Sequence, residues 1–337
     1  MNDPFAFNSI ILGRLSQETI INSRDEIFIN QPGGNLLYAA FGYCLWGGRA
    51  GLISRVGSNY PQEWIKSIAD FGFDTAGISR KTEEIDARRF YAIKGDQVAI
   101  DNPQKYFSDR SLPFPKELLG YSSEQTRLDN RKTASFFTIK PEDVPPDYYN
   151  AGFLLICPLD YITHSLIPVF FRAKSGGEVI LHPSRSYLNA SFYYDFPPIA
   201  RGAAAVIASE RHLLNLFMGR LDDIWEIMEA IVDFGVRFVV VSKQDEGYLL
   251  YDSQSRQRLI IPSYCCESVD LVGVESAFCG GFFAGYVSHR DPVRAALMGS
   301  VTASIKVQGS TPRYILNALP ELARARLDVL QDQVRVC

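Results

Sequence analysis

The sequence predicts one large α/β domain built around a mostly parallel β-sheet. From Phe153 onward, short apolar runs alternate with amphipathic helical segments. This alternation is typical of right-handed βαβ units, whose helices cover both faces of a parallel sheet. The chain has 337 residues, of which 47% are hydrophobic and 21% charged. That composition is ordinary for a globular protein, and a single α/β domain can reach this length.

The first hundred residues contain apolar runs of strand length and two helical patterns. The second apolar run is more polar than the first, which favours a strand exposed on one face. In chain order we expect a buried strand at 8–13, an exposed strand region at 17–30, a helix at 36–46, a strand at 50–56, a helix at 62–71 and a hairpin at 88–100.

The segment 102–150 breaks this pattern, because it is rich in Pro, Ser, Asp and Lys and shows little periodicity. Its part at about 120–136 is typical of a mobile surface insertion. A decorated loop is the simpler interpretation, and a segment that binds a partner is the alternative.

The C-terminal half supplies most of the sheet. We expect parallel strands at 153–158, 178–183, 204–209 and 236–242, helices at 162–174, 212–218 and 222–234, antiparallel edge strands at 248–252 and 258–262, and helices at 277–288, 291–308 and 320–330. In such a sheet the ligand site lies beyond the carboxyl ends of the strands. Here that edge is marked by Cys157, His182, Ser209 and Ser242.

Composition excludes several classes of protein. The net charge is −4 and no basic stripe is visible, which argues against nucleic-acid binding. Six cysteines without a C-x-x-C pair indicate reduced thiols, hence a cytoplasmic location, and four scattered histidines predict no metal site. No apolar run approaches about 20 residues, so we expect no membrane span. The N-terminal residues lack the pattern of a signal peptide.

The most informative stretch is DLVGVESAFCGG, from Asp270 to Gly281. A loop containing Gly273 leads directly into a helix of small and aromatic residues. The first turn of a helix has unpaired backbone N–H groups and a partial positive charge, so a glycine loop there is a natural anion pocket.

This stretch resembles the signature D-T-T-G-A-G-D-A-F-x-G-G-F of the ribokinase-like (PfkB) carbohydrate kinases. Upstream, the segments 32–34 and 56–57 resemble that family's N-terminal pattern, and the resemblance extends from about residue 8 to 312. It implies a single three-layer α/β/α domain over 1–337. It also implies a small β lid at about 17–30 and 86–108, followed by the polar insertion at about 109–150. Family members phosphorylate a hydroxyl group with ATP and Mg²⁺, and relatives often pair their lids into dimers.

The resemblance also shows what has changed. The family's catalytic Asp, which takes the proton from the attacking hydroxyl, is Ser276 here. A hydroxyl cannot serve as a general base near neutral pH, and we interpret Ser276 as an N-cap of its helix. The Gly before it is Glu275, whose charge beside the anion hole of Gly273 and Val274 would repel a phosphate.

Other family positions have drifted as well. By the same resemblance, the substrate-binding positions are Glu18, Gly33, Gly34, Tyr38 and Asn59, and the nucleotide-binding positions are Ser209, Ser242 and Gly247. Glu18 stands where the family has an Asp that binds the sugar hydroxyls, and Tyr38 stands where it has a sugar-binding Asn. Asn59 lies in a segment where the family's G-D-D motif has changed. His182 replaces the Asp of a D-P pair.

Two hypotheses follow. The first is a catalytically impaired pseudokinase that acts by binding a small molecule or a partner. The alternative is an active kinase for a sugar, nucleoside or related alcohol, in which Glu275 or Asp270 supplies the base. The direction of the Glu275 carboxylate, into the strand-end cleft or out to solvent, separates the two.

Overall fold

The computed structural model describes residues 8–95, 97–99, 102–122, 129–243 and 246–337. Its main feature is a ten-stranded sheet. In spatial order the strands are β14 (Arg335–Val336), β13 (Gln257–Ile261), β12 (Gly247–Asp252), β11 (Phe238–Lys243), β10 (Ala205–Ser209), β9 (Glu178–Leu181), β8 (Phe153–Ile156), β1 (Ser9–Leu12), β4 (Gly51–Val56) and β5 (Asp74–Arg80). Neighbours from β5 to β11 are parallel, and β12 to β14 are added antiparallel. The expected α/β class with a mostly parallel sheet is confirmed.

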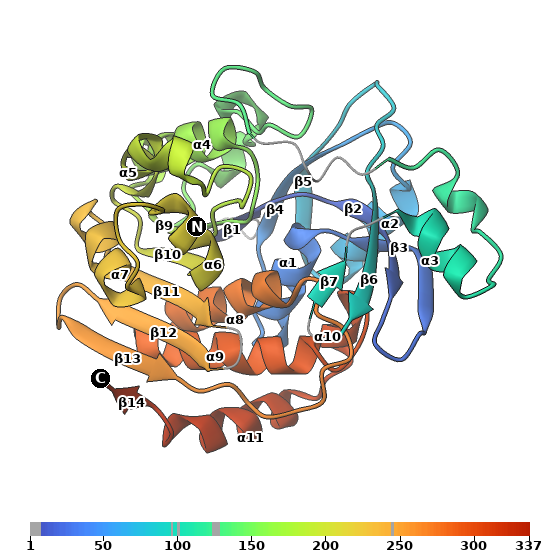
Figure 1. The fold of residues 1–337 in the computed structure, drawn as a ribbon. Helices are drawn as coiled ribbons and strands as arrows, with labels where there is room; N and C mark the ends of the chain where they lie inside the picture. The colour runs from blue at the N-terminus through green and yellow to red at the C-terminus, as the bar shows by residue number, and fades with distance from the viewer. Residues whose placement is uncertain (1–7, 96, 100–101, 123–128, 244–245) are drawn as a thin grey trace.

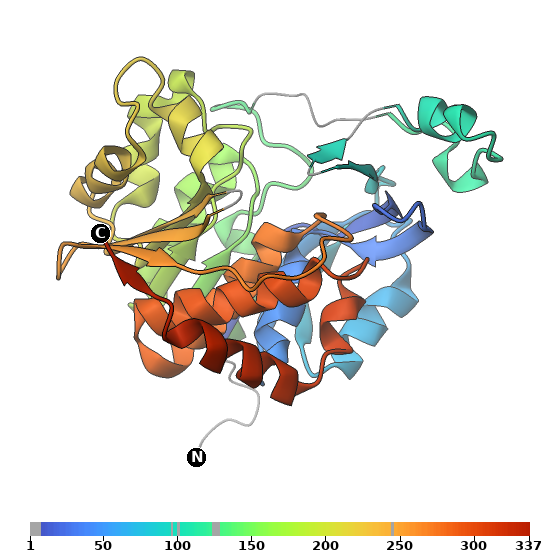
Figure 2. The ribbon, with the colours of Figure 1, turned by 60° about the horizontal axis from the view of Figure 1, so that its bottom comes forward.

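Helices cover both faces of this sheet (Figures 1 and 2). One face carries α1 (Asn35–Leu45), α2 (Gln62–Asp70), α8 (Val274–His289), α9 (Pro292–Lys306), α10 (Arg313–Leu316) and α11 (Pro320–Gln331). The other carries α4 (Tyr161–Ser175), η4 (Ala190–Asp195), α5 (Phe196–Ala200), α6 (Glu210–Leu216) and α7 (Ile224–Asp233). Alternate strand residues enter the two cores: in β11, Val240 packs into the first and Val239 and Val241 into the second.

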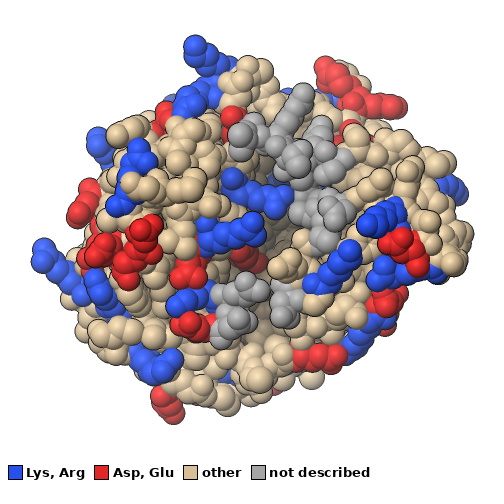
Figure 3. Space-filling view, in the orientation of Figure 1, with Lys and Arg blue, Asp and Glu red and all other residues tan. Residues whose placement is uncertain are grey.

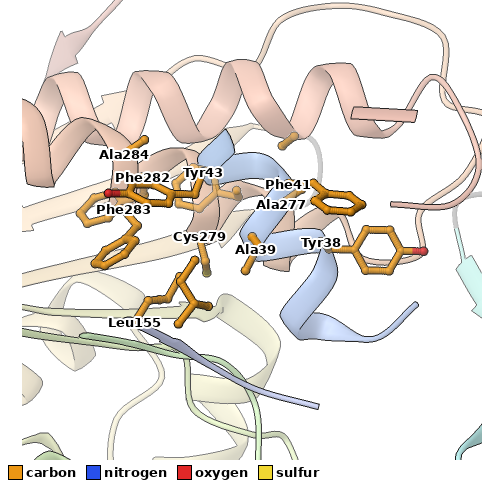
Figure 4. Packing of buried hydrophobic residues seen from close by; sticks show 14 of the residues in the cluster. Tyr38, Ala39, Phe41, Tyr43, Leu155, Ala277, Cys279, Phe282, Phe283 and Ala284 are labelled. Atoms are coloured by element: carbon orange, nitrogen blue, oxygen red, sulfur yellow. The ribbon is translucent and has the colours of Figure 1, made fainter. Parts of the chain in front are cut away.

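Glycines allow α1 and α8 to pack unusually closely. A Cβ atom at Gly280 would lie 2.0 Å from the carbonyl oxygen of Ala39, and one at Gly42 would lie 2.6 Å from that of Ala277. Aromatic side chains fill the space around this contact, where the rings of Tyr43 and Phe283 are 5.0 Å apart (Figure 4). Backbone contact therefore fixes the distance between the two helices.

A second sheet lies beside the main one. Its strands, in the order β3-β2-β6-β7, are β3 (Ile27–Gly33), β2 (Ser16–Ile21), β6 (Arg88–Lys94) and β7 (Gln97–Ala99). These strands overlap the two ranges, about 17–30 and 86–108, in which we expect lid strands, and β3 continues beyond the first range to Gly33. The helix α3 (Pro103–Asp109) and the turn η1 (Lys116–Leu118) project with it at the side of the molecule (Figure 2). Phe90, Tyr106, Phe107 and Leu118 give this unit a small apolar core of its own.

The segment 129–150 differs from the expected polar surface insertion. Ile139, Val144 and Tyr148 are buried against the main sheet, within and beside the turns η2 (Pro141–Asp143) and η3 (Pro146–Tyr148). Asp143 anchors the segment through a 2.6 Å ion pair with Arg55. Apolar residues carried by single turns have no helical or strand period, which explains why the sequence pattern does not reveal them. Residues 123–128, which belong to the expected mobile part at 120–136, lie outside the described residues.

None of the helices in the described part of the chain has the length and apolar character that a membrane crossing requires.

Candidate functional site at the carboxyl ends of the strands

The loop before α8 has the geometry of an anion pocket. Gly273 is the residue before the helix, with φ of 75°, and α8 begins at Val274. Its positive φ suits glycine and turns the chain sharply into the helix. Ser276 is buried inside the first turn and does not cap the helix, so our N-cap interpretation is wrong. The helix begins earlier than expected because Gly273 supplies the turn without a side-chain cap.

Tyr38 occupies the space directly above this loop. A Cβ atom at Gly273 would lie only 2.3 Å from the Tyr38 ring, so the ring rests against bare backbone. The Tyr38 hydroxyl donates a hydrogen bond of 2.9 Å to Oε2 of Glu18. Tyr38 and Glu18 are both almost completely buried. The two residues that resemblance assigns to sugar binding therefore bind each other.

The Glu18 carboxylate accepts three hydrogen bonds, one of them from the Tyr38 hydroxyl. Its Oε1 accepts hydrogen bonds from the Ser16 hydroxyl at 2.9 Å and from the Gly34 amide at 2.7 Å. Gly33 lies so close that a Cβ atom there would overlap the same carboxylate. Burial raises the pKa of Glu18, although these hydrogen bonds oppose the shift. The structure thus brings Glu18, Gly33, Gly34, Tyr38 and Gly273 together as a packed cluster.

Asp270 is bound to a buried lysine. The Lys306 ammonium lies 3.1 Å from Oδ2 of Asp270, and both side chains are fully buried. The same ammonium donates to the carbonyl oxygens of Asp270 and Gly309, each at 3.1 Å. Burial lowers the pKa of Lys306, and the charge of Asp270 opposes that shift. A carboxylate held in this way supports the loop and is poorly placed to accept a proton from a substrate.

Glu275 points toward the end of β9. Its Oε2 lies 3.6 Å from Nε2 of His182, and the Glu275 side chain is 49% exposed. Desolvation opposes ionisation of Glu275, but the nearby His182 outweighs this effect and lowers the pKa of Glu275. The carboxylate therefore lies beside His182 at the end of β9, half-exposed to solvent, and its lowered pKa keeps it ionised at neutral pH.

The expected nucleotide-binding residues make contacts among themselves and their neighbours. The Ser209 hydroxyl is 2.7 Å from Nδ1 of His212. Ser242 lies at the end of β11 opposite Tyr248. Gly247, with φ of 90°, begins β12 where a Cβ atom would lie 2.4 Å from the Ile261 carbonyl. Within the described ranges, no three His, Cys, Asp or Glu side chains gather as a metal site.

Asn59 is separate from the Tyr38 cluster. Its side-chain amide exchanges two hydrogen bonds, of 3.0 and 3.1 Å, with the backbone of Ile85. It lines a smaller cavity of about 250 Å³ with Gln17 and Arg88. Asn59 therefore links its own loop, after β4, to the loop that contains Ile85.

The large cavity of the site lies beside the predicted residues. It has a volume of about 930 Å³ and is bounded by the segment 129–137 and by the ends of β8 and β9. None of the candidate residues named from the sequence lines it. Four arginines do: Arg14, Arg89, Arg185 and Arg211. Arg14, Arg185 and Arg211 follow closely after the ends of β1, β9 and β10, so basic residues after predicted strands are the signal that could have identified them.

Comparison with known proteins agrees with this architecture. The pfkB family carbohydrate kinase profile matches residues 173–318. A cytidine kinase from Thermococcus kodakarensis is 24% identical over 280 residues, which cover 82% of this chain and 87% of the relative.

Solved structures show the same fold. An E. coli protein described as a ribokinase II, in complex with ATP and Mg²⁺, superposes with a TM-score of 0.69 at 15% identity, covering 96% of this chain and 99% of that one. The aminoimidazole riboside kinase of Salmonella enterica, complexed with aminoimidazole riboside and an ATP analogue, gives 0.67 at 14% identity, with 95% and 99% covered.

These matches define a ribokinase-like α/β protein with a lid sheet. Within this fold, residues 173–318 are similar to the pfkB family of carbohydrate kinases.

Proposed function

We propose that this chain is a PfkB-family kinase homologue with strongly impaired phosphoryl transfer, which acts by binding a small-molecule ligand. The observation that carries this proposal is the position of Tyr38. Its ring covers Gly273 and its hydroxyl binds Glu18, so the buried pocket beside the anion loop is filled by the protein itself.

The base position supports the same conclusion. Ser276 offers a hydroxyl where proton transfer needs a carboxylate, and loss of a positioned general base costs about 10²–10⁴ in rate. Asp270 is held by Lys306 inside the core. Ser209, which the resemblance assigns to nucleotide binding, is hydrogen-bonded to His212, and neither side chain offers a carboxylate to a hard cation.

The test is a phosphotransfer assay on the purified protein. We expect no ADP release above background with Mg²⁺-ATP and a panel of nucleosides and sugars, cytidine and ribose included. Turnover on any of these near the ~1–100 s⁻¹ of kinases would overturn the proposal. A separate calorimetric experiment tests whether Glu275 blocks nucleotide binding. ATP is titrated, with and without Mg²⁺, into wild type and into Glu275→Gly, and binding by the variant alone would show that the glutamate blocks the site.

One observation favours a second candidate, an active kinase for a nucleoside or sugar. The ionised Glu275 carboxylate is half-exposed and lies 3.6 Å from His182, so it could accept a proton one residue away from the family position. The match to a cytidine kinase supports the same substrate class. If the protein is an active kinase with Glu275 as its base, wild type turns over a substrate and Glu275→Gln does not. If phosphoryl transfer is impaired, neither protein shows turnover.

A further inference from the structure

The lid sheet rests on the main domain through an apolar face. Ile20 of β2 and Ile93 of β6 are buried, and both belong to the same apolar core as α1 and α8. Phe28 of β3 and Tyr91 of β6 pack against this core as well. A lid that swung away would expose these side chains to water, which is unfavourable in proportion to the apolar area uncovered. The apolar contact therefore favours a closed lid.

The turn between β2 and β3, residues 22–26, adds polar bonds from the lid to the main domain. The Ser23 amide donates to the Val269 carbonyl at 3.0 Å. The Arg24 guanidinium donates to both oxygens of the Glu267 carboxylate, at 3.3 and 2.6 Å. Figure 3 shows charges of both signs interspersed at the right of this face, where the lid strands and α3 lie in Figure 1. Ion pairs at the surface of the lid are thus part of its attachment.

Asn22 holds this turn in the shape that reaches the main domain. Its Oδ1 accepts hydrogen bonds from the amides of Arg24 and Glu26, both at 3.0 Å. Its Nδ2 donates to the Ser310 hydroxyl at 3.2 Å, and both Asn22 and Ser310 are buried. We use the word latch for three connections together: Ser23 to Val269, Arg24 to Glu267, and Asn22 to Ser310.

The part of the main domain that receives the latch is itself fixed. The amides of Val269 and Asp270 donate to the Val307 carbonyl at 2.8 and 2.9 Å. The Lys306 ammonium pairs with the Asp270 side chain and donates to the Gly309 carbonyl. These bonds hold the receiving segments together at the end of α9, so the turn of the lid binds to a rigid surface.

We propose that the latch keeps the lid closed in the protein without help from a ligand, and that release of the turn 22–26 is the step that opens the lid. Glu18 and Tyr38 join the first half of β2 to α1, and the latch fixes the turn that follows this strand. The lid is therefore held at two separate points. This inference goes beyond the proposed function and does not depend on it, because a latched lid controls access to the site in an active kinase and in an impaired one.

Hydrogen exchange measures the opening directly, because the Ser23 amide is bonded across the latch. The experiment is residue-resolved exchange of the full chain without added ligand, read by mass spectrometry with electron-transfer fragmentation. We expect the Ser23 amide to exchange at least about a hundredfold more slowly than the same amide in an unstructured peptide. Protection of less than about tenfold would overturn the proposal, because the lid would then open freely.

A conservative variant tests the buried bond of the latch. Ser310→Ala removes the acceptor of the Asn22 amide group without adding volume, and it should speed exchange of the Ser23 amide about two- to tenfold. Exchange at the wild-type rate would show that this bond does not help to hold the lid.

Charge reversal tests the exposed ion pair. Arg24→Glu places two carboxylates side by side and should speed Ser23 exchange about two- to fivefold at low salt. Adding Glu267→Arg should restore slow exchange. Arg110→Gln is the matched control, because Arg110 pairs with Asp25 of the same turn at 2.8 Å but connects the turn to α3 within the lid. Its Ser23 exchange should match wild type. Equal effects of Arg24→Glu and Arg110→Gln, or no recovery in the double variant, would contradict the latch.

Discussion

The hydroxyl of Tyr38 donates to Oε2 of Glu18 at 2.9 Å, in a place where neither side chain reaches water. Tyr38 lies in the first turn of α1 and Glu18 in the lid strand β2. This hydrogen bond therefore joins the lid to the main domain directly above Gly273. The following predictions begin from this pair.

Replacing Tyr38 by Phe should destabilise the protein. The ring still fills the space over Gly273, but Oε2 of Glu18 loses its donor and stays buried. An unsatisfied buried acceptor costs about 1–3 kcal/mol, which urea unfolding at pH 7 can measure. Tyr194→Phe, at a side chain that is largely exposed, is the matched control and should change the unfolding free energy little. Equal stability of the Tyr38 and Tyr194 variants would show that the bond contributes nothing.

Glu18→Gln should change the pH dependence of stability. Because burial raises the pKa of Glu18, the folded chain keeps a proton that the unfolded chain releases above about pH 4.3. Wild-type stability from this group is therefore present below that pH and is lost as pH rises through the folded pKa. The stability of Glu18→Gln relative to wild type should increase from pH 5 to pH 8 in urea titrations, whereas exposed Glu63→Gln should show no trend. A decrease with pH would mean that the pKa is not raised.

His164 should make wild type sensitive to acid. Its ring is fully buried, with Nδ1 hydrogen-bonded to the Tyr187 hydroxyl and Nε2 to the Cys157 carbonyl. Burial lowers its pKa to about 4 from an ordinary 6.5. The unfolded chain gains this proton first, so stability is full above pH 6.5 and falls by up to ~3 kcal/mol toward pH 4.

The test compares wild type, His164→Gln and the exposed control His289→Gln between pH 7.5 and 4.5. Gln cannot gain a proton, so its variant should lose less stability over this range than the other two. Parallel pH profiles for all three proteins would exclude His164 as the source.

Lys306→Met should be among the most damaging single changes. It leaves the buried Asp270 carboxylate without its cation, and breaking a buried ion pair costs about 3–5 kcal/mol. The loss appears as a lower midpoint of urea unfolding. Lys66→Met, at an exposed position on α2, controls for the change of residue type. Adding Asp270→Asn should recover part of the loss, because it removes the unpaired charge, and no recovery would mean that packing alone explains the effect.

Gly280→Ala should disrupt the contact between α1 and α8. The new Cβ would lie 2.0 Å from the Ala39 carbonyl oxygen, and backbone cannot move aside as a flexible side chain can. Overpacking of this kind costs about 1–3 kcal/mol, measurable as a lower thermal midpoint. Ser288→Ala, at an exposed position on the same helix, should be neutral or slightly stabilising, because alanine favours helix. A neutral Gly280→Ala would indicate that the helices can separate at little cost.

Much of the fold could be predicted from the sequence because its signals are local. The strand at Phe238–Lys243 is a run of apolar β-formers, and α7 shows a regular apolar stripe. The buried turns around Ile139 and Tyr148 have no such period, so they were not anticipated. The start of α8 was misplaced for a related reason: the conformation of Gly273, rather than the hydroxyl of Ser276, begins the helix.

The site was only partly predictable because its cavity is assembled by topology. Gly273, Tyr38 and Glu18 stand in recognisable motifs, but the arginines are isolated in the sequence, at positions 14, 89, 185 and 211. They converge only because β1, β9 and β10 end at the same edge and the lid strand folds over it. Nor does the sequence reveal that Tyr38 rests on Gly273, since the two residues are more than 200 positions apart.

The contact of Gly280 and Gly42 with the facing backbone also has a consequence for engineering. Since the spacing of α1 and α8 does not depend on side-chain volume, it is insulated from changes around the cavity. Substitutions at exposed positions of the cavity wall should therefore leave the packing of α1 against α8 unchanged, and new ligand preferences could be sought without redesigning this helix pair.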